Sequence, residues 1–148
     1  MTHEWHNGEY TISTDRARID LNVVLDYLQN QAYWAKGRAR EVIERSIQHS
    51  ENFGVYRSVP NDGIVQVGLA RVVTDYATFA YVCDVFILPS EQGRGLGKWL
   101  MATMLSHPHL QGLRLWYLRT RDAHDLYRQF GFTELQEPER SMERPGNG

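Results

Sequence analysis

Apolar residues recur at intervals of three and four residues in two segments near the start of the chain. The first segment covers residues 21–28, and the second covers residues 39–47. This spacing gathers the apolar side chains on one face of a helix, so each segment predicts an amphipathic helix. Residues 1–18 are mostly polar, and only Tyr10–Thr14 is predicted to form a short strand there.

Alternating and then continuous apolar positions predict three strands in the middle of the chain. Phe53–Val59 and Ile64–Val73 are joined by Pro60-Asn61-Asp62-Gly63, a composition typical of a tight turn. Phe79–Leu88 is almost entirely apolar, which is typical of a central strand buried on both faces. Pro89 ends this strand, because proline lacks the N–H that a further ladder hydrogen bond requires.

Short elements alternate in the last third of the chain. A helix is predicted from Leu96 to about His107. Three further elements are expected: a strand at Leu113–Leu118, a helix at Asp122–Phe130 and a strand at Phe132–Gln136. The order of elements predicts an α/β (α+β) fold with one mixed sheet, in which hairpins link the first strands and helical crossovers link the later ones.

Length and composition indicate one soluble domain. The 148 residues suffice for a single core, so we expect one domain over residues 1–148, with a core of about 8–137 and a polar tail over 138–148. The formal net charge is -2 and the 16 basic residues are scattered, which argues against a nucleic-acid partner.

Two further observations predict a cytoplasmic location by default. Cys83 is the single cysteine, so no disulfide can form within the chain. Met1–Asn7 is polar, unlike a signal peptide, and no apolar stretch is long enough to cross a membrane.

The segment Gln92-Gly93-Arg94-Gly95-Leu96-Gly97-Lys98 joins the buried strand to the next helix and predicts a phosphate-binding turn. Glycines let the backbone approach a ligand closely, and the first N–H groups of a helix have no partner within it. Trp99 follows Lys98 where a Walker A loop requires Ser or Thr, and Lys98 stands where a dinucleotide fingerprint requires glycine. A glycine-rich turn that only reverses the chain is the alternative interpretation.

Two motifs in this region resemble the GCN5-related N-acetyltransferase (GNAT) family. Three positions of the turn, Gln92, Gly95 and Gly97, match the family signature of Gln or Arg, two residues, Gly, one residue, then Gly or Ala. Flanking residues extend the resemblance over about residues 79–132: Ile87-Leu88-Pro89, Ala123 to Tyr127, and Gly131-Phe132. Thr120 departs from the pattern, since the family commonly has asparagine at the start of the later helix.

The resemblance implies the GNAT acyl-CoA N-acyltransferase fold, a splayed sheet flanked by helices with acetyl-CoA between its fourth and fifth strands. The backbone at Phe86 and Ile87 would pair with the pantetheine arm. The amides of Gly93–Lys98 would hold the pyrophosphate, and Thr120 and Ala123 would lie beside the coenzyme. Arg94 and Lys98 would add positive charge near the phosphates.

The resemblance also implies direct attack of an amine on the thioester in a ternary complex. Tyr127 matches the position of the general acid, since a phenol with an ordinary pKa of about 10 is protonated at neutral pH. Packing between helix and sheet is its alternative role. Asp84 lies in an apolar strand and is a candidate general base, but an arginine-paired aspartate and a water chain are equal alternatives. The oxyanion donor is expected to be a backbone N–H near Phe86 or Ile87.

The acceptor is the least defined part of the prediction. Tyr33 and Trp34 lie between the first two helices, where they are expected to contact the substrate or, equally, to pack in the core. The acceptor could be a small metabolite, a polyamine-like compound or a protein amine. The resemblance to the family also implies a homodimer. His107 and His109 have no acidic or cysteine partners at ligand spacing, so no metal site is expected. A non-catalytic CoA-binding sensor and a transferase of longer acyl chains are the rival functions.

Overall fold

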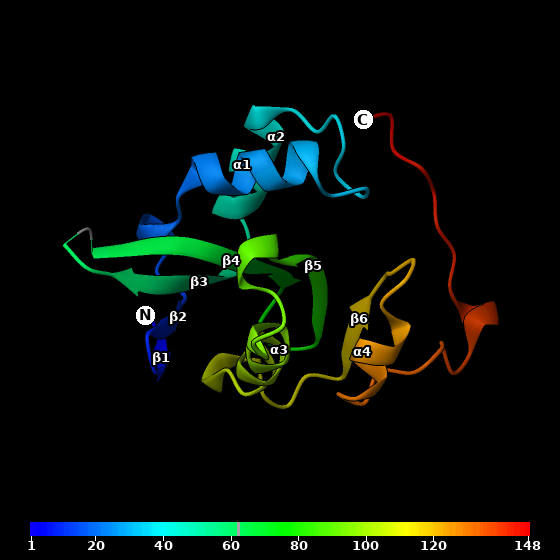
Figure 1. Ribbon diagram of the computed structural model, residues 1–148. Coiled ribbons are helices and arrows are strands. Elements are labelled where there is room, and N and C mark those ends of the chain that lie inside the picture. Colours follow the sequence, from blue (N-terminus) through cyan, green and yellow to red (C-terminus); the bar gives the residue numbers. More distant parts are fainter. Residues whose placement is uncertain (62) are drawn as a thin grey trace.

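Six strands form one mixed sheet in the computed structural model of this protein, which describes residues 1–61 and 63–148 (Figure 1). The strands are β1 (Glu4–Asn7), β2 (Tyr10–Ser13), β3 (Glu51–Val59), β4 (Gly63–Thr74), β5 (Phe79–Ile87) and β6 (Leu115–Leu118). They lie in the sheet in chain order. Neighbours from β1 to β5 are antiparallel, whereas β5 and β6 run parallel.

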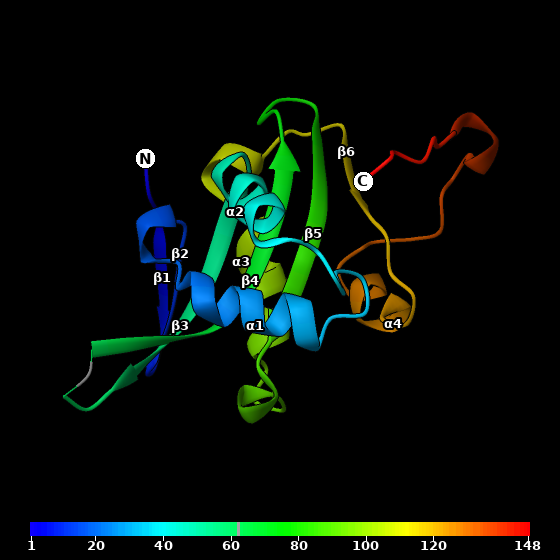
Figure 2. The same ribbon diagram turned by 90° about the horizontal axis from the view of Figure 1, so that it is seen from above.

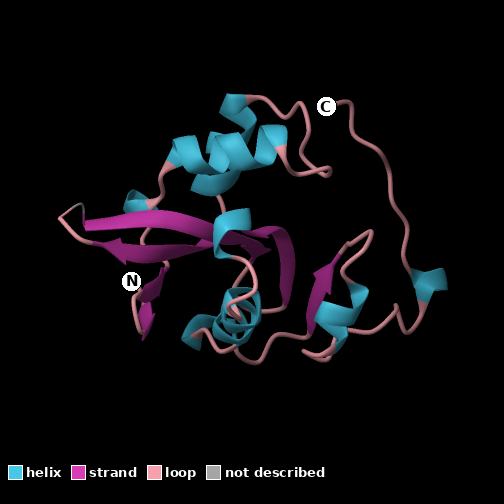
Figure 3. Ribbon diagram, viewed as in Figure 1, coloured by secondary structure: helices cyan, strands magenta, loops and turns pink. Residues whose placement is uncertain are grey.

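Helices cover both faces of this sheet, as Figures 1 and 3 show. They are α1 (Leu21–Asn30), α2 (Arg40–Gln48), α3 (Leu96–Leu105) and α4 (His124–Arg128). Two of them, α1 and α2, lie on one face and α3 lies on the other. The carboxylate of Asp20 accepts hydrogen bonds from the N–H groups of Asn22 and Val23, so it caps the start of α1.

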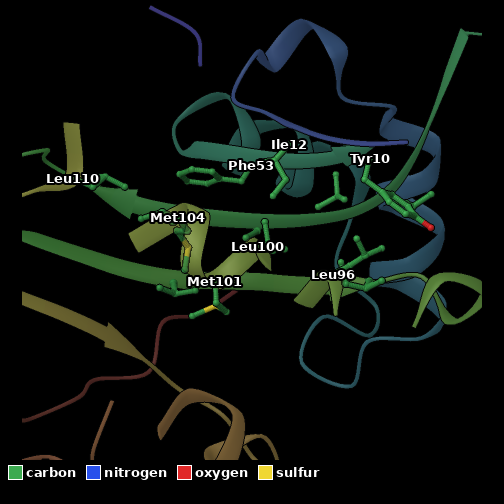
Figure 4. Packing of buried hydrophobic residues seen from close by; sticks show 14 of the residues in the cluster. Tyr10, Ile12, Phe53, Leu96, Leu100, Met101, Met104 and Leu110 are labelled. Atoms are coloured by element: carbon green, nitrogen blue, oxygen red, sulfur yellow. The ribbon is translucent and has the colours of Figure 1, made fainter. Parts of the chain in front are cut away.

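The core is divided into two apolar clusters by the sheet. On one face, the apolar side of α3 packs on strand residues such as Ile12 and Phe53 (Figure 4). On the other face, side chains of α1 and α2 pack on Leu69 and Phe86. Burial of each such large side chain stabilises the fold by roughly 1.5–3 kcal/mol, so the central strands are fixed from both sides.

Most predicted elements are confirmed to within a few residues of their ends. The differences lie at the two ends of the chain: β1 was not predicted, because its four residues are mostly polar and exposed. The helix predicted at Asp122–Phe130 is confined to α4, and the strand predicted at Leu113–Leu118 is confined to β6. The predicted turn at residues 60–63 contains Asp62, which lies outside the described residues.

The strand predicted at Phe132–Gln136 is wrong. This segment forms no strand, and its polar side chains bond locally instead. Glu134 pairs with Arg128, and the Gln136 amide donates to the Thr133 hydroxyl at 2.9 Å. Such local bonds give the segment an alternative to a sheet ladder. Residues 138–148 are all exposed.

In the part of the chain that the structure describes, no helix has the length and apolar character needed to span a membrane.

Candidate active site

The sheet opens between its last two strands. The β5–β6 ladder pairs only Phe79–Val82 with Leu115–Leu118. β5 then continues to Ile87, and within the described residues no strand lies beside its second half on that side. In Figure 2, α4 and the connection between α1 and α2 lie near this unpaired half of β5. The splayed sheet expected from the sequence is therefore present.

A cleft of about 600 Å³ lies at this opening. Three segments line it: β5 from Tyr81 to Val85, the connection from β6 to α4 with Tyr127, and the aromatic residues between α1 and α2. Its volume is within the range of about 300–1,000 Å³ that is typical of sites for small molecules. The fold thus brings Tyr127, Asp84, Tyr33 and Trp34 to a single cavity, although they are up to 94 positions apart in the chain.

A β-bulge at Asp84 shapes the wall of the cleft. Leu69 pairs with Phe86, but Arg71 pairs with Cys83, so two residues of β5 lie opposite one residue of β4. Asp84 has a φ of 46°, in the left-handed region that few residues other than glycine adopt. Bulges of this kind redirect side chains and backbone groups next to active sites.

The carboxylate of Asp84 is held by four hydrogen bonds. Trp34 Nε1 donates to Oδ1 at 2.8 Å, and Arg71 Nε donates to Oδ2 at 2.8 Å. Arg38 Nη1 donates to both oxygens, at 3.1 and 3.0 Å. A carboxylate has about four lone-pair directions, so these donors use its whole accepting capacity. These contacts correspond to the alternative in which Asp84 is paired with arginines.

Tyr127 projects from α4 into the same cleft. Its ring packs edge-on against Phe132, with 5.9 Å between the ring centroids. Burial raises the pKa of its phenol, and the Tyr33 hydroxyl and the Asp122 carboxylate nearby raise it further. Among the described residues no group forms a hydrogen bond with the phenol, which is protonated at neutral pH and free to donate.

Tyr33 and Trp34 form one side of the cleft and are 42% and 38% exposed, so neither is a buried core residue. Their rings meet edge to face at 5.2 Å. The guanidinium of Arg121 lies 3.7 Å from the centroid of the Tyr33 ring, and the Arg121 N–H donates to the Tyr33 hydroxyl at 3.0 Å. These contacts tie the α1–α2 connection to the segment before α4.

The glycine-rich turn lies at the start of α3. Gly93 and Gly95 have φ values of 82° and 79°, which favour glycine at both positions. The Gln92 side chain donates to the Ile87 carbonyl at 3.0 Å and so anchors the turn to the end of β5. No side chain among the described residues caps α3, and a Cβ added at Gly97 would meet no atom within 4 Å. The free amides and the open space around them suit a diphosphate.

The charged residues of the turn differ in their contacts. Arg94 Nη1 donates to the Tyr10 hydroxyl at 2.7 Å and lies 3.6 Å from Glu91 Oε1. Glu91 is buried and also pairs with Arg57 at 3.2 Å. Lys98 is exposed. Arg94 is therefore tied to the protein, and Lys98 extends into solvent beside the open amides.

The remaining predicted coenzyme contacts lie along the opening. Phe86 and Ile87 belong to the unpaired half of β5, and the Phe86 ring is buried against Tyr27 with 4.1 Å between centroids. Thr120 and Ala123 line the cleft. The Thr120 hydroxyl accepts from the Ala123 N–H at 3.0 Å, so it stabilises the turn that leads into α4.

Sequence reasoning did not identify the arginines of the cleft. Arg38, Arg71 and Arg121 come from three separate segments, and no spacing in the sequence relates them. Cys83 also lines the cleft, and burial raises the pKa of its thiol, so it is a poor nucleophile at neutral pH. Within residues 1–61 and 63–148, no group of three or more His, Cys, Asp or Glu side chains is arranged to hold a metal ion.

Comparisons with known proteins agree with this geometry. The family model described as the Acetyltransferase (GNAT) domain matches residues 50–134. A Gibberella zeae protein named as an acetyltransferase is 30% identical over 151 residues, which cover 90% of this chain and 84% of that protein. The ribosomal protein bS18-alanine N-acetyltransferase of Haemophilus influenzae is 27% identical over 93 residues, covering 61% of this chain and 62% of that enzyme. A crystal structure of a protein assigned to the GNAT family from Xanthomonas campestris pv. campestris has a TM-score of 0.86, 43% identity and 93% coverage of both chains.

Proposed function

Because this chain belongs to the GNAT acetyltransferase family, we propose that it transfers the acetyl group of acetyl-CoA directly to a primary amine in a ternary complex. The parting of β5 and β6 carries this proposal. It creates a cleft with Tyr127 on one wall and an unpaired strand on the other. The uncapped glycine-rich start of α3 follows directly from that strand.

The coenzyme would lie along the unpaired half of β5. The backbone of Phe86 and Ile87 would pair with the amides of its pantetheine arm, as a neighbouring strand would. The amides from Gly93 to Lys98 would hold the diphosphate, and Lys98 would add positive charge. Gln92 would keep the turn in place through its bond to the Ile87 carbonyl. Thr120 and Ala123 would lie on the opposite side of the cleft.

The chemistry requires one bond to form and one to break. The neutral amine attacks the thioester carbonyl carbon, and a backbone N–H of β5 near Phe86 or Ile87 stabilises the oxyanion. The C–S bond then breaks as the amide forms. The thiolate takes the phenolic proton of Tyr127. The proton of the attacking nitrogen passes to water in the cleft, and water returns a proton to the Tyr127 phenolate. The raised pKa of Tyr127 keeps its phenol protonated at neutral pH, as a proton donor requires.

Asp84 remains a candidate base, but its contacts support a positioning role more strongly. Its four hydrogen bonds hold the bulge of β5 in a backbone conformation that costs energy. In this role Asp84 directs the backbone N–H groups of the bulge toward the cleft, and Trp34 is held against the same wall. Proton removal is then left to water.

The experiment that tests the function measures coenzyme binding and transfer separately. Calorimetry with CoA reports binding, and release of free thiol from acetyl-CoA is followed with a panel of primary amines. We expect thiol release that depends on one class of amine, with an equal amount of acetylated amine detected by mass spectrometry. CoA binding without amine-dependent thiol release would contradict the proposal. The name of the H. influenzae relative supports including peptides with a free N-terminal alanine in the panel.

A further inference from the structure

The lining of the cleft carries an excess of positive charge. Four arginines and two aspartates line it: Arg38, Arg71, Arg119, Arg121, Asp84 and Asp122. Arg119 also pairs with Glu143, which is not part of the lining, at 3.1 Å. The whole chain has a formal net charge of -2, so this excess is a local feature and not a general basic character. The glycine-rich turn that suits the coenzyme phosphates is not part of this lining. The positive charge of the cleft is therefore separate from the turn that is expected to hold the diphosphate.

The positive charge of Arg38 is only partly balanced by a carboxylate. Arg38 and Arg71 both bind Asp84, so two guanidinium groups share a single carboxylate. The Arg71 side chain is 11% exposed and also donates to the Ser50 hydroxyl at 3.0 Å, so it belongs to the wall. The Arg38 side chain is 24% exposed, and its bonds to Asp84 use Nη1 alone. Its remaining N–H groups are available to a ligand in the cleft.

A second charge is held in an orientation suited to an anion. Cζ of Arg121 lies over the Tyr33 ring, 3.7 Å from the ring centroid. Stacking leaves the edge of a guanidinium, with its fork of N–H donors, free to bind a carboxylate through two bonds. Within the described residues, Arg121 forms no ion pair. The Tyr33 ring and the Arg121 guanidinium therefore lie next to each other in the cleft.

We infer that the acceptor is a small amino carboxylate, such as an amino acid, whose carboxylate binds Arg121 and Arg38 while its amine faces the thioester. This inference rests on the proposed transferase function of the same cleft. A polyamine would bring a second positive charge next to these arginines, and like charges held at short distance disfavour binding. Tyr33 and Trp34 would contact the apolar part of the acceptor.

The test uses acceptors that differ only in charge. Each of a set of free amino acids is compared with its own C-terminal amide, and aliphatic diamines are added as cationic acceptors. We expect the best amino acid to exceed its amide in kcat/KM at least tenfold, mainly through KM, with diamines slowest. In Arg121→Gln the ratio of kcat/KM for the amino acid to kcat/KM for its amide should fall several-fold. Arg121→Lys should give a ratio between those of the wild type and Arg121→Gln, because lysine keeps the charge but lacks the paired N–H donors of the guanidinium.

Arg45→Gln is the matched control, because Arg45 is exposed on α2 and lies outside the cleft. It removes the same charge from the chain and should leave the ratio unchanged, and melting temperatures of all variants report folding. The inference is wrong if amides or diamines react as well as the acids, or if Arg121→Gln leaves the ratio of acid to amide unchanged. Neither result would contradict the transferase function. If no amine of any charge reacts although CoA binds, the proposed function fails and the inference with it.

Discussion

Arg71 and Asp84 form a buried ion pair across the bulge that opens the sheet. Nε of Arg71 lies 2.8 Å from Oδ2 of Asp84, and their side chains are 11% and 2% exposed. The pair joins β4 to the one position of β5 that has a left-handed backbone conformation. Asp84 is the charged residue of an otherwise apolar strand, and its ion pair stabilises the wall of the cleft.

Asp84→Asn should destabilise the protein more than it changes the pH dependence of the reaction. The asparagine amide group would face the guanidinium donors of Arg38 and Arg71, and a buried ion pair that loses one partner costs about 3–5 kcal/mol. Urea denaturation measures the loss. Asp26→Asn, an exposed change on α1, is the control and should cost well under 1 kcal/mol.

The pH–rate profile of Asp84→Asn separates its two candidate roles. If Asp84 positions the bulge, the acidic limb of the profile stays where it is in the wild-type protein while kcat falls. If Asp84 removes the proton from the amine, that limb moves or disappears. A displaced limb in a variant that is still folded would restore Asp84 as the base.

The elements with strong periodicity were predictable from the sequence, and the contacts that define the cleft were not. The apolar pattern located α1, α2 and the long strands because burial on the two faces of the sheet decides those positions. β1 was not predictable, because a polar strand at the edge of a sheet forms through its pairing with β2 and has no apolar pattern of its own. Phe132–Gln136 has strand-like composition but no partner strand, so local side-chain bonds decide its conformation.

The candidate site shows the same division. The glycine-rich turn was predictable because positive φ and close backbone approach restrict a position to glycine. The ambiguity of Asp84 could not be resolved from the sequence, since Arg38, Arg71 and Trp34 reach it only through the tertiary fold. Long-range pairs of this kind leave no periodicity to detect.

Tyr127→Phe should lower kcat roughly a hundredfold or more with little effect on CoA affinity, because only the proton for the leaving thiolate is lost. Thiol release measures kcat, and calorimetry measures the affinity. Tyr76→Phe removes a hydroxyl from an exposed turn residue and serves as the control. Because the pKa of Tyr127 is raised above its ordinary value, the wild-type rate should not decline through loss of this proton below about pH 10. Unchanged kcat in Tyr127→Phe would remove its acid role.

His107 should make the protein sensitive to acid. Burial and the neighbouring His3 and His109 lower its pKa to about 4. Its Nδ1 accepts from the His109 N–H at 2.9 Å, and its Nε2 lies 3.2 Å from Glu51 Oε2. The unfolded chain binds a proton near the ordinary pKa of about 6.5, whereas the folded protein does not. The stability contributed by neutral His107 is therefore complete above about pH 6.5 and is lost as the pH falls toward 4.

The loss expected from His107 is at most about 3 kcal/mol, and denaturation curves at a series of pH values measure it. Burial raises the pKa of Glu51, so this group contributes stability at low pH that is lost as the pH rises, in the opposite sense. Comparison with His107→Gln isolates the histidine contribution: the variant is less stable at neutral pH but its stability changes less on acidification. His49→Gln, at an exposed position, should follow the wild-type curve. Parallel curves for His107→Gln and wild type would contradict the prediction.

Gly97 allows coenzyme binding to be separated from folding. Its backbone is helical, and beyond the neighbouring backbone of its own helix a Cβ would meet no protein atom within 4 Å. If the start of α3 holds the diphosphate, a large side chain at this position competes with it for that open space. Gly97→Leu should therefore weaken CoA binding at least tenfold, or by about 1.4 kcal/mol, in a calorimetric titration. The thermal stability of the apo protein should rise slightly, since glycine within a helix costs roughly 0.5–1 kcal/mol relative to alanine. Gly97→Ala is the matched control, because it gives the same gain in stability with a single methyl group and should keep most of the affinity. Undiminished CoA binding by a folded Gly97→Leu would show that the start of α3 does not hold the diphosphate.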